Sequence, residues 1–362
     1  MIRIFMIGMS DHKGGVESYI SNLSSALDSE EFEIINSLPE MLIDGKKWIR
    51  PQNRHHYVQY RKFWSDFFRK NRFDAIYFNT CDIVSIDMLR FAKKAGIPLR
   101  IIHSHSTGNQ QSMKGFWGWV HRMTEKRNRK DIIKYATHLF ACSEAAGKWM
   151  FGGYPFTVVK NGINLSQYTY NTVARNDIRT SCGIKESKVA GFIGRFSKVK
   201  NPEFMLEIAE KMIEKNSDAR VVMIGTGYLY DEIKAQIAAR KLTDHVLLTG
   251  SVDNVNEWLS ALDCLVMPSF FEGLPFVLVE AQAAGLPCVV SSNVSKEANL
   301  TGLVQYIDLD AGVECWTGKI LENCDKKRIN TEQTMAKNGY SIGNTAKKVS
   351  EIISDSLQQV SL

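Results

Sequence analysis

The feature that most constrains this chain is a regular alternation of short apolar runs with helix-like stretches. In the first half, strand-sized apolar runs occur at residues 2–7, 32–36, 74–79, 98–103 and 137–141. Stretches with helical periodicity, such as 84–95 and 117–135, lie between them. This order is typical of parallel sheets whose two faces are both covered by helices. The alternation therefore predicts an α/β fold.

The same alternation starts again in the second half. Strand-like runs occur there at residues 188–193, 219–224, 245–249, 262–267 and 287–291. A chain of 362 residues also corresponds to about two domains. We therefore expect two doubly wound, Rossmann-like domains that bind ligands at the carboxyl ends of their strands, in a cleft between two facing sheets. The polar, weakly periodic stretch 164–187 is typical of a connection between domains.

Charge is distributed unevenly between the two halves. Residues 1–150 contain 23 Lys and Arg against 15 Asp and Glu, whereas the remaining residues contain 22 against 24. The basic surplus indicates a negatively charged partner, which could be nucleic acid, a membrane surface or an acidic substrate. The apolar runs are shorter than the roughly 20 residues that cross a bilayer, and no signal-peptide pattern begins the chain, so we expect a cytoplasmic protein.

Two groups of residues in the first half are candidates for ligand binding. Gly14 and Gly15 follow the first apolar run, and glycines at such a turn let backbone N–H groups approach a phosphate. A plain tight turn is the alternative. His103 and His105 lie where a strand-like run ends, so that either could position a substrate or share a proton. A purely structural histidine is the alternative for each.

The second half contains a basic candidate and an acidic one. Arg195 and Lys200 follow a strand-like run, and a planar guanidinium with an ammonium group matches a pyrophosphate, although solvated surface charge is the alternative. Glu272 and Gly273 precede a helix that is expected to start near Pro275, with its positive N-terminal end toward the ligand. Glu272 and Glu280 suit the hydroxyl groups of a sugar or ribose, and Glu280 needs a partner inside its apolar helix.

Cofactor and metal motifs are absent or incomplete. Gly225 and Gly227 lack the third glycine of the dinucleotide fingerprint because position 230 is Tyr, so no nicotinamide cofactor is predicted. Asp308 and Asp310 have the spacing of a metal-binding pair but are more typical of a solvated loop. The seven cysteines form no C-x-x-C pair, which argues against zinc and redox motifs. We expect neither a cofactor nor a metal ion.

Together these motifs resemble the family-4 retaining glycosyltransferases with the GT-B fold. The resemblance covers nearly the whole chain and is densest between Gly191 and Ser291. Glu272 and Glu280, with seven residues between them, match the E-x7-E signature of the family. The other blocks follow in the family's order: Gly14-Gly15-Val16-Glu17, the two histidines, Lys160-Asn161-Gly162-Ile163, Gly194-Arg195, Lys200-Asn201 and Gly225-x-Gly227.

The resemblance implies a set of contacts to the nucleotide of a sugar donor. Arg195 and Lys200 would grip the donor diphosphate, and Glu280 would bind the ribose. Val252 would contact the base through its backbone. Gly15, in the turn that begins at Gly14, would approach the donor phosphates from the other domain.

A second set of contacts is implied for the sugar that is transferred. Glu272, with the backbone of Gly273 and Leu274, would hold this sugar. Either His105 or His103 would contact it near the reacting carbon, and His105 is favoured. The resemblance also implies an acceptor-side domain over residues 1–165, joined by a C-terminal helix at 345–362, and a donor domain over 166–344.

The basic half of the chain then suggests an acceptor. Residues 46–72 carry nine Lys and Arg with seven aromatic residues, and residues 114–134 carry seven Lys and Arg with Phe116, Trp117 and Trp119. Basic residues with aromatic ones on amphipathic helices suit an anionic membrane surface, and solvated helix faces with aromatics in the core are the alternative.

We therefore expect a peripheral enzyme on the inner face of the membrane. It would transfer a hexose or N-acetylhexosamine from a UDP-sugar to a lipid-linked saccharide, without a metal ion, in capsule or exopolysaccharide synthesis. A GT-B nucleotide-sugar epimerase or hydrolase is one alternative. A nucleic-acid-binding protein is the other, although the basic stretches match no nucleic-acid-binding motif.

Overall fold

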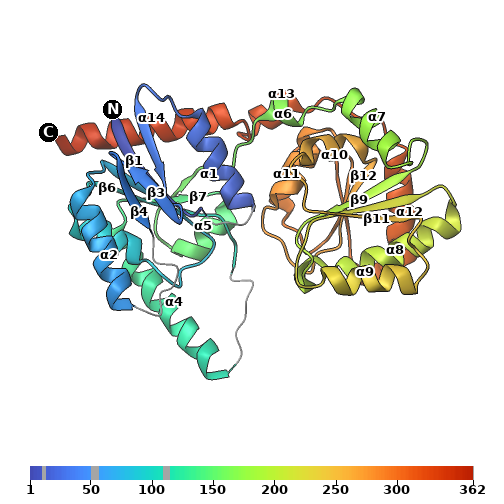
Figure 1. Ribbon diagram of the computed structural model, residues 1–362, viewed down its shortest axis with the longest axis horizontal. Coiled ribbons are helices and arrows are strands. Elements are labelled where there is room, and N and C mark those ends of the chain that lie inside the picture. The colour runs from blue at the N-terminus through green and yellow to red at the C-terminus, as the bar shows by residue number, and fades with distance from the viewer. Residues whose placement is uncertain (10–13, 50–56, 109–114, 362) are drawn as a thin grey trace. The chain divides into compact units, whose positions relative to one another are not determined.

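The computed structural model describes residues 1–9, 14–49, 57–108 and 115–361, which belong to two compact units (Figure 1). Unit 1 consists of Met1–Ile163 and Gly339–Leu362, and unit 2 of Asn164–Asn338. The sequence analysis places the corresponding transitions at 165–166 and 344–345. Both units are α/β structures built on a parallel sheet of six strands.

The sheet of unit 1 has the strand order β2-β1-β5-β6-β7-β8. The strands are β1 (Ile2–Ile7), β2 (Phe32–Asn36), β5 (Ala75–Thr80), β6 (Leu99–Ser104), β7 (His138–Ala141) and β8 (Thr157–Val158). The helices are α1 (Gly15–Ala26), α2 (Tyr57–Lys70), α3 (Asp87–Lys94), α4 (Gly115–Tyr135), α5 (Glu144–Phe151) and α14 (Ile342–Ser361). The order reverses between β1 and β5, so ligands are expected at the carboxyl ends of these strands.

The final helix, α14, belongs to unit 1 because it packs against α1. The Ser354 hydroxyl donates a hydrogen bond to Glu31 at 2.7 Å, and the Lys348 ammonium donates one to the carbonyl of Val158 at 2.9 Å. At the start of the helix, the N–H of Ile342 donates to the carbonyl of Ile163 at 2.9 Å. These bonds join the last residues of the chain to segments far earlier in the sequence.

The first basic aromatic segment, residues 46–72, contains aromatic residues that are buried in the core of unit 1. The prediction that these buried aromatic residues lie at a membrane surface is wrong. Trp64, Phe67 and Phe68 of α2 are buried and pack with Phe5 of β1 in one hydrophobic cluster. Their spacing places them on one face of the helix, which therefore turns toward the sheet. Residues 50–56 lie outside the described part of the chain.

A hairpin that the sequence analysis did not anticipate precedes α2. It consists of β3 (Glu40–Ile43) and β4 (Lys46–Ile49), which pair antiparallel. Asp44 and Gly45 connect them, with φ angles of 49° and 74°. Two residues with positive φ form the turn that matches the twist of a two-residue hairpin. Trp48 from this hairpin is buried against α2.

The second basic aromatic segment, in α4, has the opposite arrangement. Phe116 and Trp117 are each 68% exposed, and Trp119 is 54% exposed. Gly118 is buried near the start of the helix, and the other buried residues, Asn128 and Ile132, lie in its later part. In Figure 1 the beginning of α4 extends beyond the other helices of unit 1. Among the described residues, no helix is both long and apolar enough to span a bilayer.

The sheet of unit 2 has the order β11-β10-β9-β12-β13-β14, in which the first three strands in sequence run outward on one side and the next three on the other. The strands are β9 (Val189–Ile193), β10 (Arg220–Ile224), β11 (Val246–Gly250), β12 (Cys264–Met267), β13 (Cys288–Ser291) and β14 (Val304–Ile307). The main helices are α8 (Pro202–Lys215), α9 (Tyr230–Ala239), α10 (Val255–Ala261), α11 (Phe276–Ala283), α12 (Gly312–Cys324) and α13 (Glu332–Lys337). This is the doubly wound order, and it reverses between β9 and β12.

The stretch 164–187 is part of unit 2, so its interpretation as an interdomain connection is wrong. It contains α6 (Leu165–Tyr168) and α7 (Thr172–Ser181), and α7 packs against α10. Arg175 and Arg179 of α7 each form an ion pair with Asp263 at 2.6 Å. Arginine side chains make many of the contacts between this segment and the rest of unit 2. Because arginine is charged, these contacts do not appear in the pattern of hydrophobic residues, and the segment looks weakly periodic.

Candidate functional site

The loops that follow β9 and β12 meet where the strand order of unit 2 reverses. The N–H of Phe270, after β12, donates a hydrogen bond to the carbonyl of Val199, after β9, at 2.8 Å. The first loop continues through the 3-10 turn η1 (Lys198–Lys200), and the second contains Glu272. This junction therefore brings together the basic and acidic candidates that lie about 70 residues apart in the sequence.

Lys200 and Glu272 form an ion pair at this junction. Glu272 is only 7% exposed, and its carbonyl accepts a hydrogen bond from the N–H of Ser295 at 3.0 Å, so the backbone that carries the carboxylate is held. Asn201, the residue after Lys200, adopts a left-handed conformation with a φ of 55°. Helix α8 then starts at Pro202, which suits a first helical position.

Arg195 is the second basic candidate of the same loop. Its side chain is exposed and makes no hydrogen bond or ion pair with a described residue. A guanidinium group with no protein partner keeps its donors available for an anionic ligand.

Gly225 and Gly227 follow β10 and allow their loop to pack closely against the loop that carries Arg195 and Lys200. A Cβ atom at Gly225 would lie 2.1 Å from the carbonyl oxygen of Gly194, and one at Gly227 would lie 2.4 Å from that of Phe196. Both glycines also have φ angles above 120°, which other residues rarely adopt. Only glycine therefore lets the loop after β10 pass so close to the loop that carries Arg195 and Lys200.

Helix α11 begins at Phe276, shortly after Glu272, and the backbone N–H groups around its start have few partners among the described residues. Gly273, Leu274, Phe276 and Val277 donate no N–H hydrogen bond to a described residue. The residue before the helix is Pro275, which provides no side-chain cap. Free N–H groups and the positive end of the helix dipole make this turn suitable for an anionic or hydroxyl-bearing ligand.

Glu280, in the second turn of α11, has a partner that the sequence analysis did not identify. The hydroxyl of Tyr168, in α6, donates a hydrogen bond to its Oε1 at 2.9 Å. Burial raises the pKa of Glu280 to about 7, and the hydrogen bond from Tyr168 opposes this rise. Because 112 residues separate the two side chains, no local motif in the sequence could have signalled the pair.

Val252 lies in the loop between β11 and α10, at the same edge of the sheet. Its side chain is half-buried against the core of unit 2. Its backbone N–H and C=O form no hydrogen bond with the described residues. The structure thus leaves the backbone of Val252 available, as a contact to a nucleotide base requires.

The corresponding edge of unit 1 carries the two histidines, and their environments differ. His103 is fully buried. Its Nε2 lies 3.0 Å from the carbonyl oxygen of Val159, and its Nδ1 lies 3.0 Å from the Tyr77 hydroxyl. The Tyr77 hydroxyl in turn lies 3.0 Å from that of Tyr19 on α1. Both nitrogens of His103 are therefore occupied by the protein, which is the arrangement of a structural histidine.

His105 is partly accessible and is held by two asparagine side chains. Its Nε2 lies 2.9 Å from Oδ1 of Asn79, and its Nδ1 lies 2.9 Å from Oδ1 of Asn161. Burial lowers its pKa to about 3. The ring lies against Tyr19, with centroids 4.9 Å apart. Of the two histidines, His105 is the more exposed residue, but its two ring nitrogens, like those of His103, both face protein groups.

Asn79 and Asn161 were not predicted as site residues, although Asn161 belongs to the Lys160-Asn161-Gly162-Ile163 block. The neighbouring Gly162 explains part of this block, because a Cβ atom there would lie 2.4 Å from Oγ1 of Thr345. Asn161 itself is 1% exposed. The motif marks Asn161 in the sequence. Its contact with His105, 56 residues away, could be recognised only in the structure.

The glycine turn of unit 1 is described in part. Residues 10–13 lie outside the described chain, whereas Gly14 adopts an extended conformation with a φ of −142° and precedes α1. Gly15 is the first residue of that helix. The predicted approach of Gly15 to a phosphate remains a prediction.

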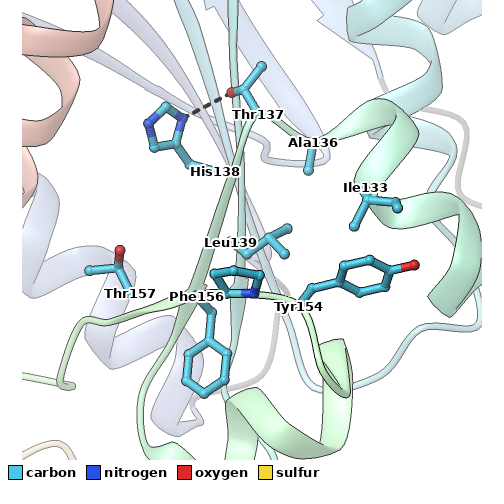
Figure 2. A pocket seen from close by; sticks show the side chains of 9 residues that line it. Ile133, Ala136, Thr137, His138, Leu139, Tyr154, Phe156 and Thr157 are labelled. Atoms are coloured by element: carbon cyan, nitrogen blue, oxygen red, sulfur yellow. Dashed lines mark hydrogen bonds between the residues drawn. The ribbon is translucent and has the colours of Figure 1, made fainter.

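A pocket of about 380 Å³ lies elsewhere in unit 1, as Figure 2 shows. His138 and Leu139, at the amino end of β7, line it together with Tyr154 and Phe156. His105 follows the opposite, carboxyl end of the same sheet, so this pocket is separate from the candidate site. In the part of the chain that the structure describes, no group of three or more His, Cys, Asp or Glu side chains could hold a metal ion.

Two family models match this chain, one in each half. The model described as Glycosyltransferase Family 4 matches residues 13–167. The model described as Glycosyl transferases group 1 matches residues 174–300, which include the junction of Lys200 and Glu272 and also Glu280.

Curated relatives match over most of their length. The Bacillus subtilis (strain 168) glycosyltransferase EpsF is 29% identical over 360 residues, which cover 93% of this chain and 92% of EpsF. An Escherichia coli UDP-Gal:alpha-D-GlcNAc-diphosphoundecaprenol alpha-1,3-galactosyltransferase is 25% identical over 309 residues, covering 79% of this chain and 76% of that enzyme.

Solved structures share the fold at lower sequence identity. HepE from Anabaena, crystallised in complex with UDP, superposes with a TM-score of 0.71 at 15% identity, covering 98% of this chain and all of HepE. WaaG, a glycosyltransferase involved in lipopolysaccharide biosynthesis, gives a TM-score of 0.64 at 15% identity, covering 97% of this chain and 99% of WaaG.

Proposed function

Since this chain belongs to the family-4 glycosyltransferases with the GT-B fold, we propose that it moves a sugar from a UDP-sugar to a lipid-linked saccharide with retention of the anomeric configuration. The donor is a UDP-hexose or a UDP-N-acetylhexosamine, and the product contributes to a bacterial capsule or exopolysaccharide. Two relatives support these choices: HepE was crystallised with UDP, and the E. coli enzyme is named for UDP-Gal and a diphosphoundecaprenol acceptor.

The junction between β9 and β12 in unit 2 carries the proposal. Lys200, paired with Glu272, and Arg195 supply cationic donors there, and the N–H groups before and within the first turn of α11, which donate to no described residue, supply neutral donors. A diphosphate carries negative charge on oxygens that accept both kinds of hydrogen bond. Glu280, with Tyr168, then holds the ribose through its carboxylate.

The chemistry follows from the groups at this junction. As the bond between the anomeric carbon and the UDP oxygen breaks, Arg195, Lys200 and the N-terminus of α11 stabilise the charge that develops on the diphosphate. Glu272 accepts hydrogen bonds from sugar hydroxyls and orients the sugar. The acceptor hydroxyl attacks the face that UDP leaves, so the configuration is retained and the departing phosphate takes the acceptor proton.

We infer that transfer requires no metal ion, because two cationic side chains and a helix N-terminus perform the charge stabilisation. Dialysis against EDTA is expected to leave the rate of sugar transfer unchanged. Loss of activity on EDTA treatment with recovery on addition of Mn²⁺ would contradict this part of the proposal.

Donor binding is tested by ligand-induced stabilisation, which rises with the ratio of ligand concentration to Kd. UDP is expected to raise the Tm of the wild-type protein, and to raise the Tm of Lys200→Gln much less. Lys198→Gln is the matched control, since Lys198 belongs to the same turn η1 but has an exposed side chain. Equal stabilisation of all three proteins by UDP would refute the assignment of the diphosphate site.

The exposed beginning of α4 supports a membrane-bound acceptor. Phe116, Trp117, Trp119 and Met123 are 49–68% exposed there. Exposed basic side chains follow along the helix: Lys126, Arg127, Lys130 and Lys134. Aromatic residues at one end with cations behind them suit the boundary between acyl chains and anionic headgroups. We propose that this end of α4 inserts into the cytoplasmic leaflet that holds the lipid-linked saccharide.

Vesicle flotation tests this surface. The wild type is expected to float with vesicles containing phosphatidylglycerol at low salt, and the variant Trp117→Ser with Trp119→Ser is expected to remain in the lower fraction. The matched control replaces Tyr57 and Val58, the exposed apolar residues at the start of α2, with Ser. If the α2 control loses binding and the α4 variant retains it, the membrane surface has been assigned to the wrong helix.

A further inference from the structure

The geometry around Glu280 points to a role for the hydroxyl group of Tyr168. We propose that Tyr168 is a positioning residue, which holds Oε1 of Glu280 and so leaves Oε2 as the acceptor for the two vicinal hydroxyl groups of a ribose. This inference rests on the proposed function, in which Glu280 binds the ribose of a UDP-sugar. Tyr168 acts through the carboxylate rather than through its own contact with the ligand.

The two oxygens of the Glu280 carboxylate have different surroundings. Oε1 accepts a hydrogen bond from the Tyr168 hydroxyl at 2.9 Å. Oε2 accepts no hydrogen bond from the residues that the structure describes, and it is not one of the fully buried polar atoms that lack a partner. With respect to these residues, Oε2 is therefore open to solvent, although Glu280 as a whole is only 8% exposed. An open carboxylate oxygen has two lone pairs with which it can accept from ligand hydroxyl groups.

Packing and hydrogen bonds fix the position of the Tyr168 ring. Tyr168 is the last residue of α6, and its ring packs against the hydrophobic core of unit 2. Leu165, at the other end of this short helix, is buried. The carbonyl of Gln167 accepts a hydrogen bond from Nδ2 of Asn256, on α10, at 3.2 Å. Helix α6 contacts both α10 and α11, so the Tyr168 hydroxyl is held beside Glu280.

The neighbourhood of this pair suits the ribose of a nucleotide. Helix α10 follows the loop that carries Val252, the proposed contact to the base. Helix α11, which carries Glu280, begins shortly after Glu272 in the proposed diphosphate site. In a nucleoside diphosphate the ribose joins the base to the diphosphate. Because α6 contacts both helices, the pair of Tyr168 and Glu280 lies between these two contacts.

The hydrogen bond from Tyr168 also favours the charged form of Glu280. Burial raises the pKa of Glu280 to about 7, and this hydrogen bond opposes the rise. Glu280 is the only titratable residue of α11. The described titratable side chains on the elements packed against α11 are Tyr168 on α6, Glu257 on α10 and Cys288 on β13. Among these, only Tyr168 affects the pKa of Glu280, so loss of its hydroxyl makes the carboxylate harder to ionise.

The effect of Tyr168 is measured by comparing UDP with 2′,3′-dideoxy-UDP, which lacks both ribose hydroxyl groups. Isothermal titration calorimetry on the full chain gives the Kd of each nucleotide, and the ratio of the two values isolates the contribution of these hydroxyl groups. At pH 8 the wild type is expected to bind UDP roughly 10–100-fold more tightly, as hydrogen bonds to a charged acceptor require. At pH 7 the ratio is expected to be roughly fivefold lower in Tyr168→Phe than in the wild type.

Two further variants serve as controls. Tyr170 lies two residues after Tyr168, and its hydroxyl makes no hydrogen bond with a described residue. Tyr170→Phe should therefore keep the ratio of the wild type. Glu280→Gln keeps the shape of the side chain without its charge, so its ratio should be low and independent of pH. A ratio in Tyr168→Phe that equals those of the wild type and Tyr170→Phe would overturn the inference.

The pH dependence of the ratio separates positioning from packing. Because the ionised carboxylate is the better acceptor, the ratio in the wild type should fall as the pH decreases through about 7. In Tyr168→Phe the same fall should occur at a higher pH, since the hydrogen bond no longer lowers the pKa of Glu280. A tyrosine that only packs would change the Kd of both nucleotides equally and leave the pH of this fall unchanged, which would also overturn the inference.

The behaviour of the wild type distinguishes this inference from the function on which it rests. If the wild type binds no UDP, the proposed function fails, and the inference fails with it. If the wild type binds UDP and prefers it to 2′,3′-dideoxy-UDP, but Tyr168→Phe does so equally, the inference alone is overturned. If the wild type binds both nucleotides with the same Kd, Glu280 does not bind the ribose hydroxyl groups. The inference is then overturned while the diphosphate site stands.

Discussion

The edge of unit 2 that carries Lys200 and Glu272 and the edge of unit 1 that carries His103 and His105 lie at the carboxyl ends of two similar sheets, but they consist of different groups. In unit 2 the loops after β9 and β12 carry an ion pair, an exposed arginine and backbone N–H groups that donate to no residue the structure describes. In unit 1 the two histidines are joined by hydrogen bonds to tyrosine and asparagine side chains.

This difference matches the chemistry of the two parts of a nucleotide sugar. A diphosphate is charged, and it is bound through cations and helix N-termini. A sugar is neutral, and its position is fixed by donors and acceptors with defined directions. The comparison therefore predicts that changes in unit 2 act through charge, whereas changes in unit 1 act through lost hydrogen bonds.

The largest effect is expected for charge removal in unit 2. Lys200→Gln is expected to lower kcat/KM by roughly 10²–10³-fold, as the loss of one preorganised charge-stabilising donor does in other enzymes. Steady-state kinetics with a UDP-sugar and its acceptor measure this loss. Lys198 lies two residues earlier in the same turn and has an exposed side chain, so Lys198→Gln should remain within about threefold of wild type. Equal losses of kcat/KM in both variants would show that activity depends on the total charge of the loop and not on the contact made by Lys200.

The next effect is expected on stability in unit 1. His103→Ala removes the side-chain partner of the Val159 carbonyl and one of the two hydrogen-bond partners of the Tyr77 hydroxyl, both in the interior. Orphaned buried groups cost about 2–3 kcal/mol, which corresponds to a Tm lower by roughly 5–10 °C. Differential scanning fluorimetry measures the shift. His105→Ala should be less destabilising, because His105 is partly accessible; a larger drop for His105→Ala would break the distinction between the two histidines.

The smallest effect is expected for the pH dependence of unit 2. Burial raises the pKa of Glu280 to about 7. A carboxyl with a raised pKa stabilises the fold while protonated, so this contribution is lost as the pH rises through 7. The free energy of unfolding is therefore expected to fall by about 1 kcal/mol between pH 6 and pH 8 on account of Glu280.

Chemical denaturation of Glu280→Gln provides the comparison, because an amide keeps the shape without titrating. The variant should lack this part of the decline with pH. If the free energy of unfolding of Glu280→Gln falls by the same amount between pH 6 and pH 8, other groups cause the fall. Glu280 would then not titrate in this pH range.

Much of the fold was predictable because parallel strands buried on both faces are continuous apolar runs, as in β9 (Val189–Ile193) and β10 (Arg220–Ile224). The β3–β4 hairpin was missed because it is short and carries charges on its exposed face. Helix α7 was missed because arginines bonded to Asp263 provide much of its attachment.

The two basic aromatic segments show where composition is insufficient. In α2 the aromatics recur at positions 60, 63, 64, 67 and 68, which form one helical face, and the structure buries most of that face. In α4 they cluster at 116, 117 and 119 near the helix start, and they remain exposed. Spacing along the helix, rather than the count of aromatics, distinguishes the two.

The site was predictable where its chemistry is local to a motif. Lys200, Glu272 and Glu280 have charges and spacing that identify them in the sequence. Tyr168 and Asn79 do not, because each contacts a candidate residue that is distant in sequence: Glu280 for Tyr168 and His105 for Asn79. Such contacts depend on the folded sheet and leave no pattern in the chain.

One measurement tests the central claim most directly. The purified protein is incubated with UDP-galactose, UDP-glucose and UDP-N-acetylglucosamine in turn, each with and without vesicles that contain a diphosphoundecaprenol-linked saccharide. We predict that one of the UDP-sugars transfers its sugar to the lipid, with one UDP released for each sugar transferred, and that Lys200→Gln is nearly inactive. Release of UDP at the same rate without acceptor, or full activity of Lys200→Gln, would contradict the account.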